Sequence, residues 1–173
     1  HHRLVGSEMC IRDSIRCFIK GLKMTKIAIN GIGRIGKLVL KLLLQNKYDI
    51  KYLNEINGDT KSLIHSLEFD SIHGKWDGCF VLNNDSIKIN NKEIKTTFFS
   101  NIEDLNLDDI DLILDCTGVH KSSSKLQKYF DKGVKKVIVS APINEDNIVN
   151  IAYGVNHNIY KPKEHNIITG ASC

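Results

Sequence analysis

Three spaced glycines, in the run Gly31-Ile-Gly33-Arg-Ile-Gly36, constrain the fold of this chain more than any other feature. The segment before them, Lys26–Asn30, has the apolar pattern of a short buried strand. After them, apolar residues recur at helical spacing from Arg34 onward. A strand, a glycine-rich turn and a helix in this order predict the first unit of a dinucleotide-binding domain. The alternative is a glycine-rich turn that binds no ligand.

Each of the three glycines has its own predicted role. Gly31 allows the tight turn, Gly33 lets the backbone approach a pyrophosphate, and Gly36 lets the helix pack closely on the strand. The amino terminus of the helix then presents free N–H groups and the positive end of the helix dipole to the phosphates. The turn is therefore a candidate cofactor-binding site.

An acidic residue follows the second predicted strand. Glu55 comes directly after the stretch Asp49–Asn54, about 20 residues beyond the glycine turn, where a carboxylate is expected to hold the adenosine ribose. A carboxylate at this place would repel a 2′-phosphate, so the pattern predicts NAD rather than NADP. The alternative is a solvated acid in a loop.

Two further loops that follow predicted strands carry small polar residues. Thr117 and Gly118 come after a buried strand, and Ser140 comes after another. Ligands of open α/β sheets bind at the carboxyl ends of the strands, which makes all three residues candidates for cofactor contact. By residue type alone they could equally cap the strands.

Strand and helix patterns alternate through the rest of the chain, which predicts an α/β fold with a Rossmann-type, doubly wound, mostly parallel sheet. Cys79–Leu82 and Ser86–Asn90 flank three turn-forming residues, and a second turn precedes Glu93–Phe98, so an antiparallel hairpin excursion is expected. The other expected strands are Asp49–Leu53, Asp111–Asp115, Val134–Val139 and Asn166–Thr169, with further helices from Thr60 and over Ser122–Lys132.

Composition argues against several functional classes. The 173 residues carry 24 basic and 20 acidic side chains with no dense basic stripe, so nucleic acid is not an expected partner. No apolar run reaches the roughly 18 residues of a membrane span. Five cysteines occur without the spacing of a disulfide framework or a metal site, which favours a reducing, cytoplasmic setting and no metal.

Residues 1–23 differ in character from the rest of the chain, with isolated charges and no sustained period. We expect them to be a non-native extension, a presequence or a genuine addition being the alternatives. Residues 24–173 are expected to form one NAD-binding domain.

Six segments of the chain carry a resemblance to a known family. Together they are similar to the amino-terminal half of phosphorylating glyceraldehyde-3-phosphate dehydrogenase, from about Met24 to the last residue. The segments, in order, are Ile29–Gly36, Phe69–Gly74, Cys116–Gly118, Lys136–Pro142, Gly154–His157 and Ala171–Cys173.

The resemblance implies a set of cofactor-binding residues and a nucleophile. Residues of the glycine turn would line the pyrophosphate, an acid would hold the adenosine ribose, and two hydroxyl residues would lie near the cofactor. These residues are Gly33, Arg34 and Ile35, then Glu55, then Thr117 and Ser140. Cys173 would be the catalytic nucleophile. Two departures from the family pattern are His120, where an aromatic residue is common, and Gly170, where a small polar residue is common.

The implied chemistry is oxidation of a phosphorylated aldehyde. A cysteine thiolate adds to glyceraldehyde 3-phosphate, hydride passes to NAD, and inorganic phosphate releases the resulting thioester as an acyl phosphate. The family's catalytic histidine follows the cysteine, and Cys173 is the last residue here, so the 173-residue chain alone is expected to be inactive. The parent enzyme is expected to be a homotetramer.

Three alternatives stay open. Erythrose 4-phosphate could replace glyceraldehyde 3-phosphate as the substrate. Arsenate could replace phosphate, as in a bacterial branch that several segments of the chain resemble. A stand-alone NAD-binding module, acting as a sensor or interaction partner, is the alternative from another functional class.

Overall fold

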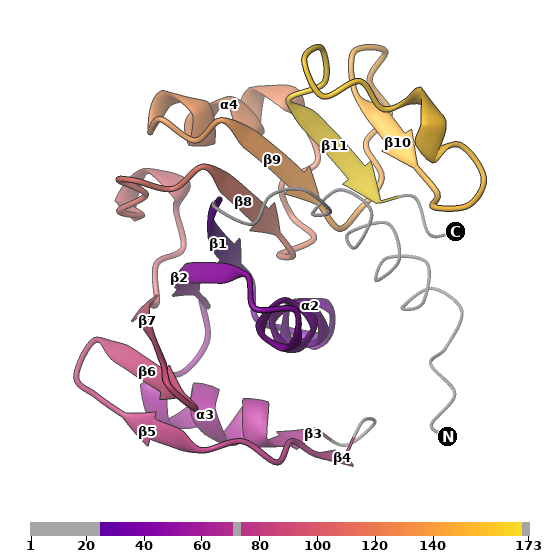
Figure 1. Cartoon of the computed structure of the whole chain (residues 1–173). Helices are drawn as coiled ribbons and strands as arrows, with labels where there is room; N and C mark the ends of the chain where they lie inside the picture. The colour runs from indigo at the N-terminus through magenta and orange to yellow at the C-terminus, as the bar shows by residue number, and fades with distance from the viewer. Residues whose placement is uncertain (1–24, 71–73, 171–173) are drawn as a thin grey trace.

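A computed structural model describes residues 25–70 and 74–170 of the chain (Figure 1). The predicted nucleophile Cys173 and residues 1–23 lie outside this part. The described strands are β1 (Lys26–Asn30), β2 (Asp49–Asn54), β3 (Phe69–Asp70), β4 (Gly74–Lys75), β5 (Phe80–Leu82), β6 (Ser86–Ile89), β7 (Lys92–Thr97), β8 (Leu112–Asp115), β9 (Lys136–Val139), β10 (Val149–Ile151) and β11 (Ile167–Gly170). The helices are α2 (Arg34–Gln45), α3 (Thr60–Glu68) and α4 (Ser123–Asp131), with 3-10 turns η1 (Ile102–Asp104) and η2 (His157–Ile159).

The main sheet has the strand order β10-β11-β9-β8-β1-β2-β7-β6-β5. Strands from β10 to β7 in this order pair in parallel, and β6 and β5 extend the sheet antiparallel. The expected mostly parallel sheet with an antiparallel excursion is therefore confirmed. The strand order reverses at β1, which has β2 on one side and β8 on the other, and this places a binding crevice at the carboxyl ends of β1 and β8.

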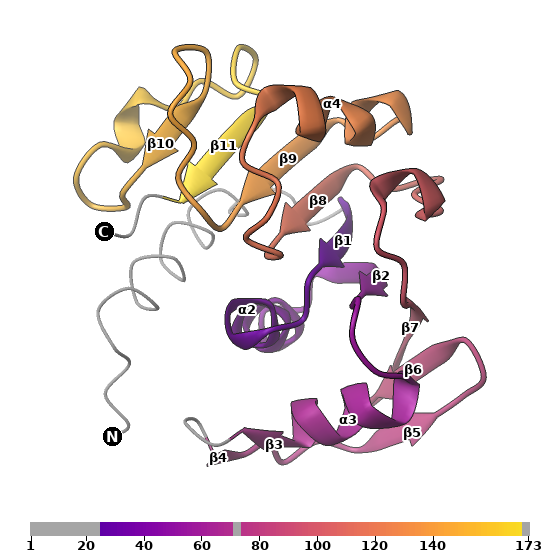
Figure 2. The ribbon, with the colours of Figure 1, turned by 180° about the vertical axis from the view of Figure 1, so that it is seen from behind.

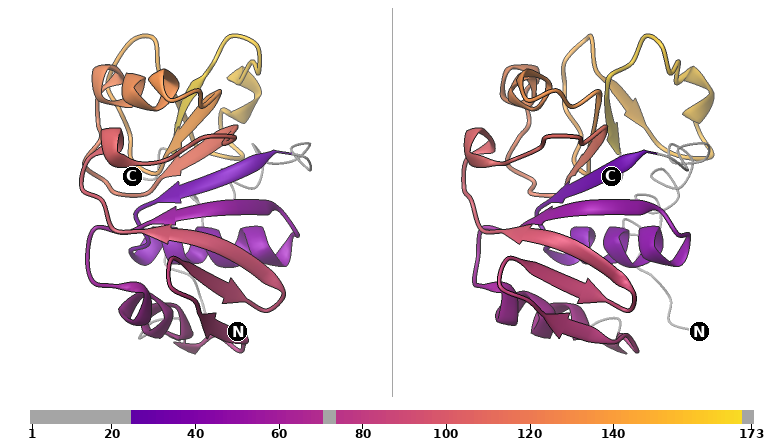
Figure 3. Two further views of the ribbon diagram at one scale, coloured as in Figure 1. Left: turned by 90° about the vertical axis from the view of Figure 1, so that its left-hand side faces the viewer. Right: turned by 60° about the vertical axis from the view of Figure 1, so that its left-hand side comes forward.

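Helices cover both faces of the sheet, as the views in Figures 2 and 3 show. One core packs α2 and α3 against the sheet, with Ile29, Leu40 and Leu67 among its buried residues. The other core packs α4 and η1 against the opposite face, around Leu126 and Tyr129. Alternate residues of a strand point to opposite faces, so β1 contributes to both cores.

The helix ends follow from local chemistry. Asp59 caps α3 because its carboxylate accepts a hydrogen bond from the N–H of Ser62 at 2.7 Å. Ser122 caps α4 in the same way through the N–H of Lys125, and Gly133, with φ of +87°, follows the carboxyl end of that helix. By contrast, α2 has no side-chain cap.

Several strand predictions differ from the structure. β3 and β4 were not expected, and most of the other strands begin or end one residue away from their predicted bounds. β9 begins at Lys136 rather than Val134, because the N–H of Val134 still bonds to Tyr129 of α4. β10 was not expected, since its three residues carry no period of their own and it exists by pairing with β11.

Asp111 ties the amino ends of three strands together. Its carboxylate accepts hydrogen bonds from the N–H of Lys26 at the start of β1 at 3.0 Å and from the ammonium of Lys135 before β9 at 2.6 Å. The contact with Lys135, and then the one with Lys26, lowers the pKa of Asp111. The folded state therefore holds the proton less tightly than the unfolded chain, and the stabilisation is present above the unfolded pKa and lost as pH falls through the folded value.

We predict that Asp111→Asn unfolds at a lower urea concentration than the wild type at pH 7, and that this difference shrinks below about pH 4, where an unperturbed aspartate takes up its proton. Asp109→Asn is the matched control, since Asp109 pairs with Lys26 but is 82% exposed. A destabilisation by Asp111→Asn that does not change with pH would contradict the prediction.

Candidate functional site

A pocket opens at the carboxyl ends of β1, β2 and β8, in the crevice that the strand order predicts. It is framed by the glycine turn, by the loop after β2, by the loop after β7 and by the loop after β8. Its lining residues are Asn30, Gly31, Gly33, Asn54, Glu55, Ile56, Asn57, Phe99, Ser100, Cys116, Thr117, Val119 and His120.

The glycine turn lies directly against the loop after β8. Gly31 has φ of +88°, and a Cβ added to it would come within 2.7 Å of the Thr117 nitrogen. A Cβ on Gly36 would come within 2.0 Å of the Gly31 carbonyl oxygen. Side chains are excluded at both positions, which explains the first and third glycines of the motif.

Gly33 has a different environment. A Cβ added to it would meet no atom within 4 Å, and its φ of −72° is open to any residue. The space beside it is therefore open, and because Gly33 lines the pocket, a ligand group can approach its backbone closely. Gly33 is also the N-cap of α2, which has no side-chain cap and no acidic residue in its first turn, so the unpaired N–H groups there suit an anion.

Glu55 faces the same turn from the end of β2. One carboxylate oxygen accepts a hydrogen bond from the N–H of Ile32 at 2.7 Å, and the other accepts one from the N–H of Asn57 at 3.2 Å. A carboxylate has about four acceptor positions, so two remain for hydroxyl groups in the pocket. This environment fits the expected ribose contact and places it beside the glycine turn.

Of the other predicted cofactor residues, some line the pocket and others do not. Thr117 lines the pocket, and its hydroxyl donates to Asp115 at 2.6 Å. Gly118, with φ of +74°, and Ser140, beside the Cys116 thiol, do not line it. Arg34, Ile35 and Gly36 also lie outside the lining, since they follow the turn into α2.

Cys116 is the thiol that the described part of the chain brings to the pocket. Burial, and then the neighbouring charge of Asp115, raise the pKa of Cys116 to about 12. The sulfur is therefore protonated at neutral pH, and a protonated thiol is a poor nucleophile.

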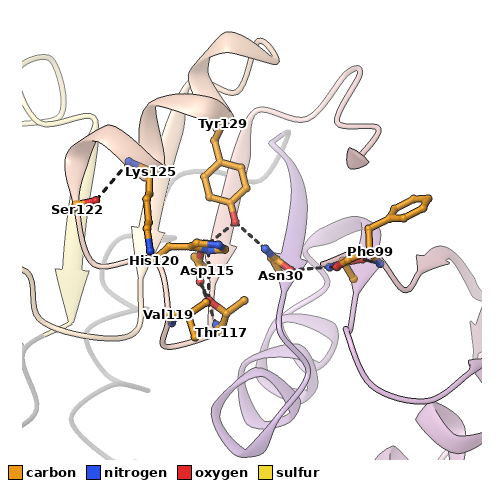
Figure 4. A network of polar contacts seen from close by, with 10 residues as sticks. Asn30, Phe99, Asp115, Thr117, Val119, His120, Ser122, Lys125 and Tyr129 are labelled. Atoms are coloured by element: carbon orange, nitrogen blue, oxygen red, sulfur yellow. Dashed lines mark hydrogen bonds and ion pairs between the residues drawn. The ribbon is translucent and has the colours of Figure 1, made fainter. Parts of the chain in front are cut away.

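A buried polar network lies beneath the pocket and was not predicted (Figure 4). Asp115 is fully buried, and its carboxylate accepts hydrogen bonds from Tyr129 at 2.8 Å and from Thr117, and contacts His120 Nδ1 at 2.6 Å. Tyr129 in turn accepts from Asn30 at 2.7 Å. The only signals in the sequence were polar residues at the ends of two strands, which do not reveal their partners.

The residues that the structure describes contain no group of three or more histidine, cysteine or acidic side chains placed to hold a metal ion. Within the same residues, none of the helices combines the length and the apolar character needed to cross a membrane.

Known proteins share much of this sequence. The family model described as the glyceraldehyde 3-phosphate dehydrogenase NAD binding domain matches residues 25–123. This chain belongs to that family. The family is that of an NAD-binding domain, which makes NAD the cofactor, in agreement with the sequence prediction.

Individual relatives support the family assignment. The chain is 34% identical over 151 residues to glyceraldehyde-3-phosphate dehydrogenase 3 of Nostoc sp. and 37% identical over 153 residues to glyceraldehyde-3-phosphate dehydrogenase 1 of Bacillus cereus. It is 36% identical over 151 residues to the glyceraldehyde-3-phosphate dehydrogenase of Geobacillus stearothermophilus. These matches span 86–87% of this chain but 44–45% of each relative, so the chain covers less than half of their length.

The glycine turn offers a matched pair of substitutions. Gly36→Ala should lower the free energy of unfolding by about 3 kcal/mol, because its Cβ would meet backbone at 2.0 Å. Gly33→Ala should cost at most about 1 kcal/mol, yet weaken NAD binding at least tenfold, because its Cβ would enter the space for the phosphates. Urea unfolding and calorimetric titration with NAD measure the two effects. Unchanged NAD affinity in Gly33→Ala would rule out a close phosphate approach.

The charge of Glu55 should set the choice between NAD and NADP. Glu55→Gln keeps an acceptor for Ile32 but removes the negative charge, so we predict that the ratio of NAD affinity to NADP affinity falls at least tenfold. Glu164→Gln, on the exposed surface, is the control and should leave this ratio unchanged. Equal ratios in all three proteins would show that Glu55 does not discriminate.

Proposed function

We propose that this chain is the NAD-binding part of a phosphorylating glyceraldehyde-3-phosphate dehydrogenase. The observation that carries the proposal is the combination of an open approach at Gly33 with a carboxylate, Glu55, directed at the same turn. Membership of the glyceraldehyde 3-phosphate dehydrogenase NAD-binding family supports the same function. The proposed reaction converts glyceraldehyde 3-phosphate and inorganic phosphate into 1,3-bisphosphoglycerate.

The described residues hold the cofactor in this proposal. N–H groups at the start of α2, from Arg34 and Ile35, bind the pyrophosphate, and the two remaining acceptor positions of Glu55 take ribose hydroxyls. Thr117 forms the opposite wall. When bound, NAD supplies the hydride acceptor of the reaction.

Three apolar side chains suit the adenine end of the cofactor. Ile56, Phe99 and Val119 line the pocket beyond Glu55 and are 59%, 43% and 62% exposed. Exposed apolar side chains grouped at a pocket rim are typical of a site that receives a flat apolar ligand. A purine ring would cover them and leave its ribose at Glu55.

Cys173 is the proposed nucleophile, and it lies outside the described residues. A cysteine thiolate suits aldehyde oxidation because it is strongly nucleophilic and its thioester is a good acyl donor to phosphate. We further propose a homotetrameric, cytoplasmic enzyme, as expected for the family that the sequence resembles.

Two measurements test the proposed function. The 173-residue chain should bind NAD in a calorimetric titration. The protein translated from the complete reading frame that contains this chain should form NADH from glyceraldehyde 3-phosphate, NAD and phosphate, and Cys173→Ser should abolish that formation while leaving NAD affinity unchanged. NADH formation that survives Cys173→Ser would refute the proposed nucleophile, and absence of NAD binding would refute the proposed function.

A further inference from the structure

The side chain of His120 lines the pocket, and one of its two ring nitrogens contacts a protein group. Its Nδ1 lies 2.6 Å from Asp115 Oδ2, and its side chain is 14% exposed. Its second nitrogen, Nε2, has no hydrogen-bond partner among residues 25–70 and 74–170. What this nitrogen offers to a ligand depends on which nitrogen of the ring carries the proton.

A series of hydrogen bonds that begins at the backbone of Phe99 determines which ring nitrogen of His120 carries the proton. The N–H of Phe99 donates to Asn54 Oδ1 at 2.9 Å, and the Phe99 carbonyl accepts from Asn54 Nδ2 at 2.9 Å. A backbone N–H can only donate and a carbonyl can only accept, so the Asn54 amide has a single orientation. Asn54 Nδ2 also donates to Asn30 Oδ1 at 2.8 Å, which orients the Asn30 amide in turn.

The same logic continues to Asp115. With its oxygen facing Asn54, Asn30 presents its Nδ2 to the Tyr129 hydroxyl as a donor at 2.7 Å. The proton of that hydroxyl is then free to be donated to Asp115 Oδ2 at 2.8 Å. Figure 4 shows this sequence of contacts, which runs from Phe99 across the strand ends to His120.

Asp115 receives three donors whose direction is fixed, and an ionised carboxylate has about four acceptor positions to receive them. Oδ1 accepts from the N–H and the hydroxyl of Thr117, at 3.0 and 2.6 Å. Oδ2 accepts from Tyr129 and faces His120 Nδ1. An ionised carboxylate cannot donate, so in the neutral ring the proton sits on Nδ1. Nε2 of His120 is therefore an acceptor.

We infer that His120 is a specificity-determining residue for the adenine end of the cofactor, where its Nε2 accepts a hydrogen bond from the exocyclic amino group. The inference rests on the proposed function. His120 lies beside Val119 on the loop that, with Ile56 and Phe99, frames the apolar rim of the pocket. A hydrogen-bond acceptor in that rim binds an amino group but repels a carbonyl oxygen, because the lone pairs of the carbonyl oxygen and of Nε2 would face each other. Asp115 is a positioning residue, acting through His120.

The test compares NAD with nicotinamide hypoxanthine dinucleotide, in which a carbonyl replaces the amino group. Calorimetric titration of the 173-residue chain, at a pH where its nitrogen-15 spectrum shows a neutral His120 ring, should show NAD binding about tenfold or more tightly. His120→Phe keeps a flat ring without nitrogens and should bring the two affinities close together, chiefly by weakening NAD. His65→Phe, at an exposed position of α3 outside the pocket lining, is the matched control and should retain the wild-type preference.

A second measurement reads the proton position without substitution. In nitrogen-15 spectra of the wild-type chain, neutral His120 should show the shifts of a ring protonated at Nδ1. Asp115→Asn should reverse the preference toward the hypoxanthine dinucleotide, because the amide nitrogen of asparagine would donate to Nδ1 and leave the proton on Nε2. The wild-type spectrum keeps the inference falsifiable even where Asp115→Asn unfolds the chain.

The outcomes separate this inference from the proposed function. If neither dinucleotide binds the wild type, the proposed function fails and the inference fails with it. If both bind equally, the inference alone is overturned. Equal weakening of both dinucleotides by His120→Phe would indicate a ribose contact and overturn the adenine assignment. A ring protonated at Nε2 in the wild-type spectrum would overturn it as well.

Discussion

The contact between the glycine turn and the loop after β8 is the constraint on which the rest of the structure depends. At Gly31 the backbone passes so close to Thr117 that no Cβ fits, and the turn is held there by hydrogen bonds to its neighbours. The Gly31 N–H donates to the Asn54 carbonyl at 2.8 Å, and the Cys116 N–H donates to the Asn30 carbonyl at 2.7 Å. These bonds align the ends of β2, β1 and β8, and the pocket is the space that this alignment leaves open.

Beneath that contact, a single buried carboxylate organises the polar groups. Asp115 is fully buried, and burying a charge without partners would cost several kcal/mol. Donors from Thr117 and Tyr129, together with the ring of His120, compensate for this cost. The same contacts hold the loop after β8 in place, so the interactions that stabilise the buried charge also shape one wall of the pocket.

Much of the fold was predictable because its signals are local. The boundaries of β1 and the start of α2 were correct, since a buried apolar strand and an amphipathic helix each carry their own period. The start of β9 was wrong because the residues after α4 still bond back to Tyr129. β10 was missed because a three-residue strand with a central asparagine shows no alternation and depends on its neighbour.

For the site, the sequence alone determined the glycine turn, the helix that follows it and the acid after β2, because each lies within a few residues of the element that positions it. The Asn54–Asn30–Tyr129–Asp115–His120 network was decided only by the tertiary structure. Asn30 and Tyr129 are 99 residues apart, and they meet because β8 pairs with β1 rather than with a strand next to it in sequence. A hydrogen bond between side chains requires a specific distance and direction, and no local pattern contains the strand order that sets them.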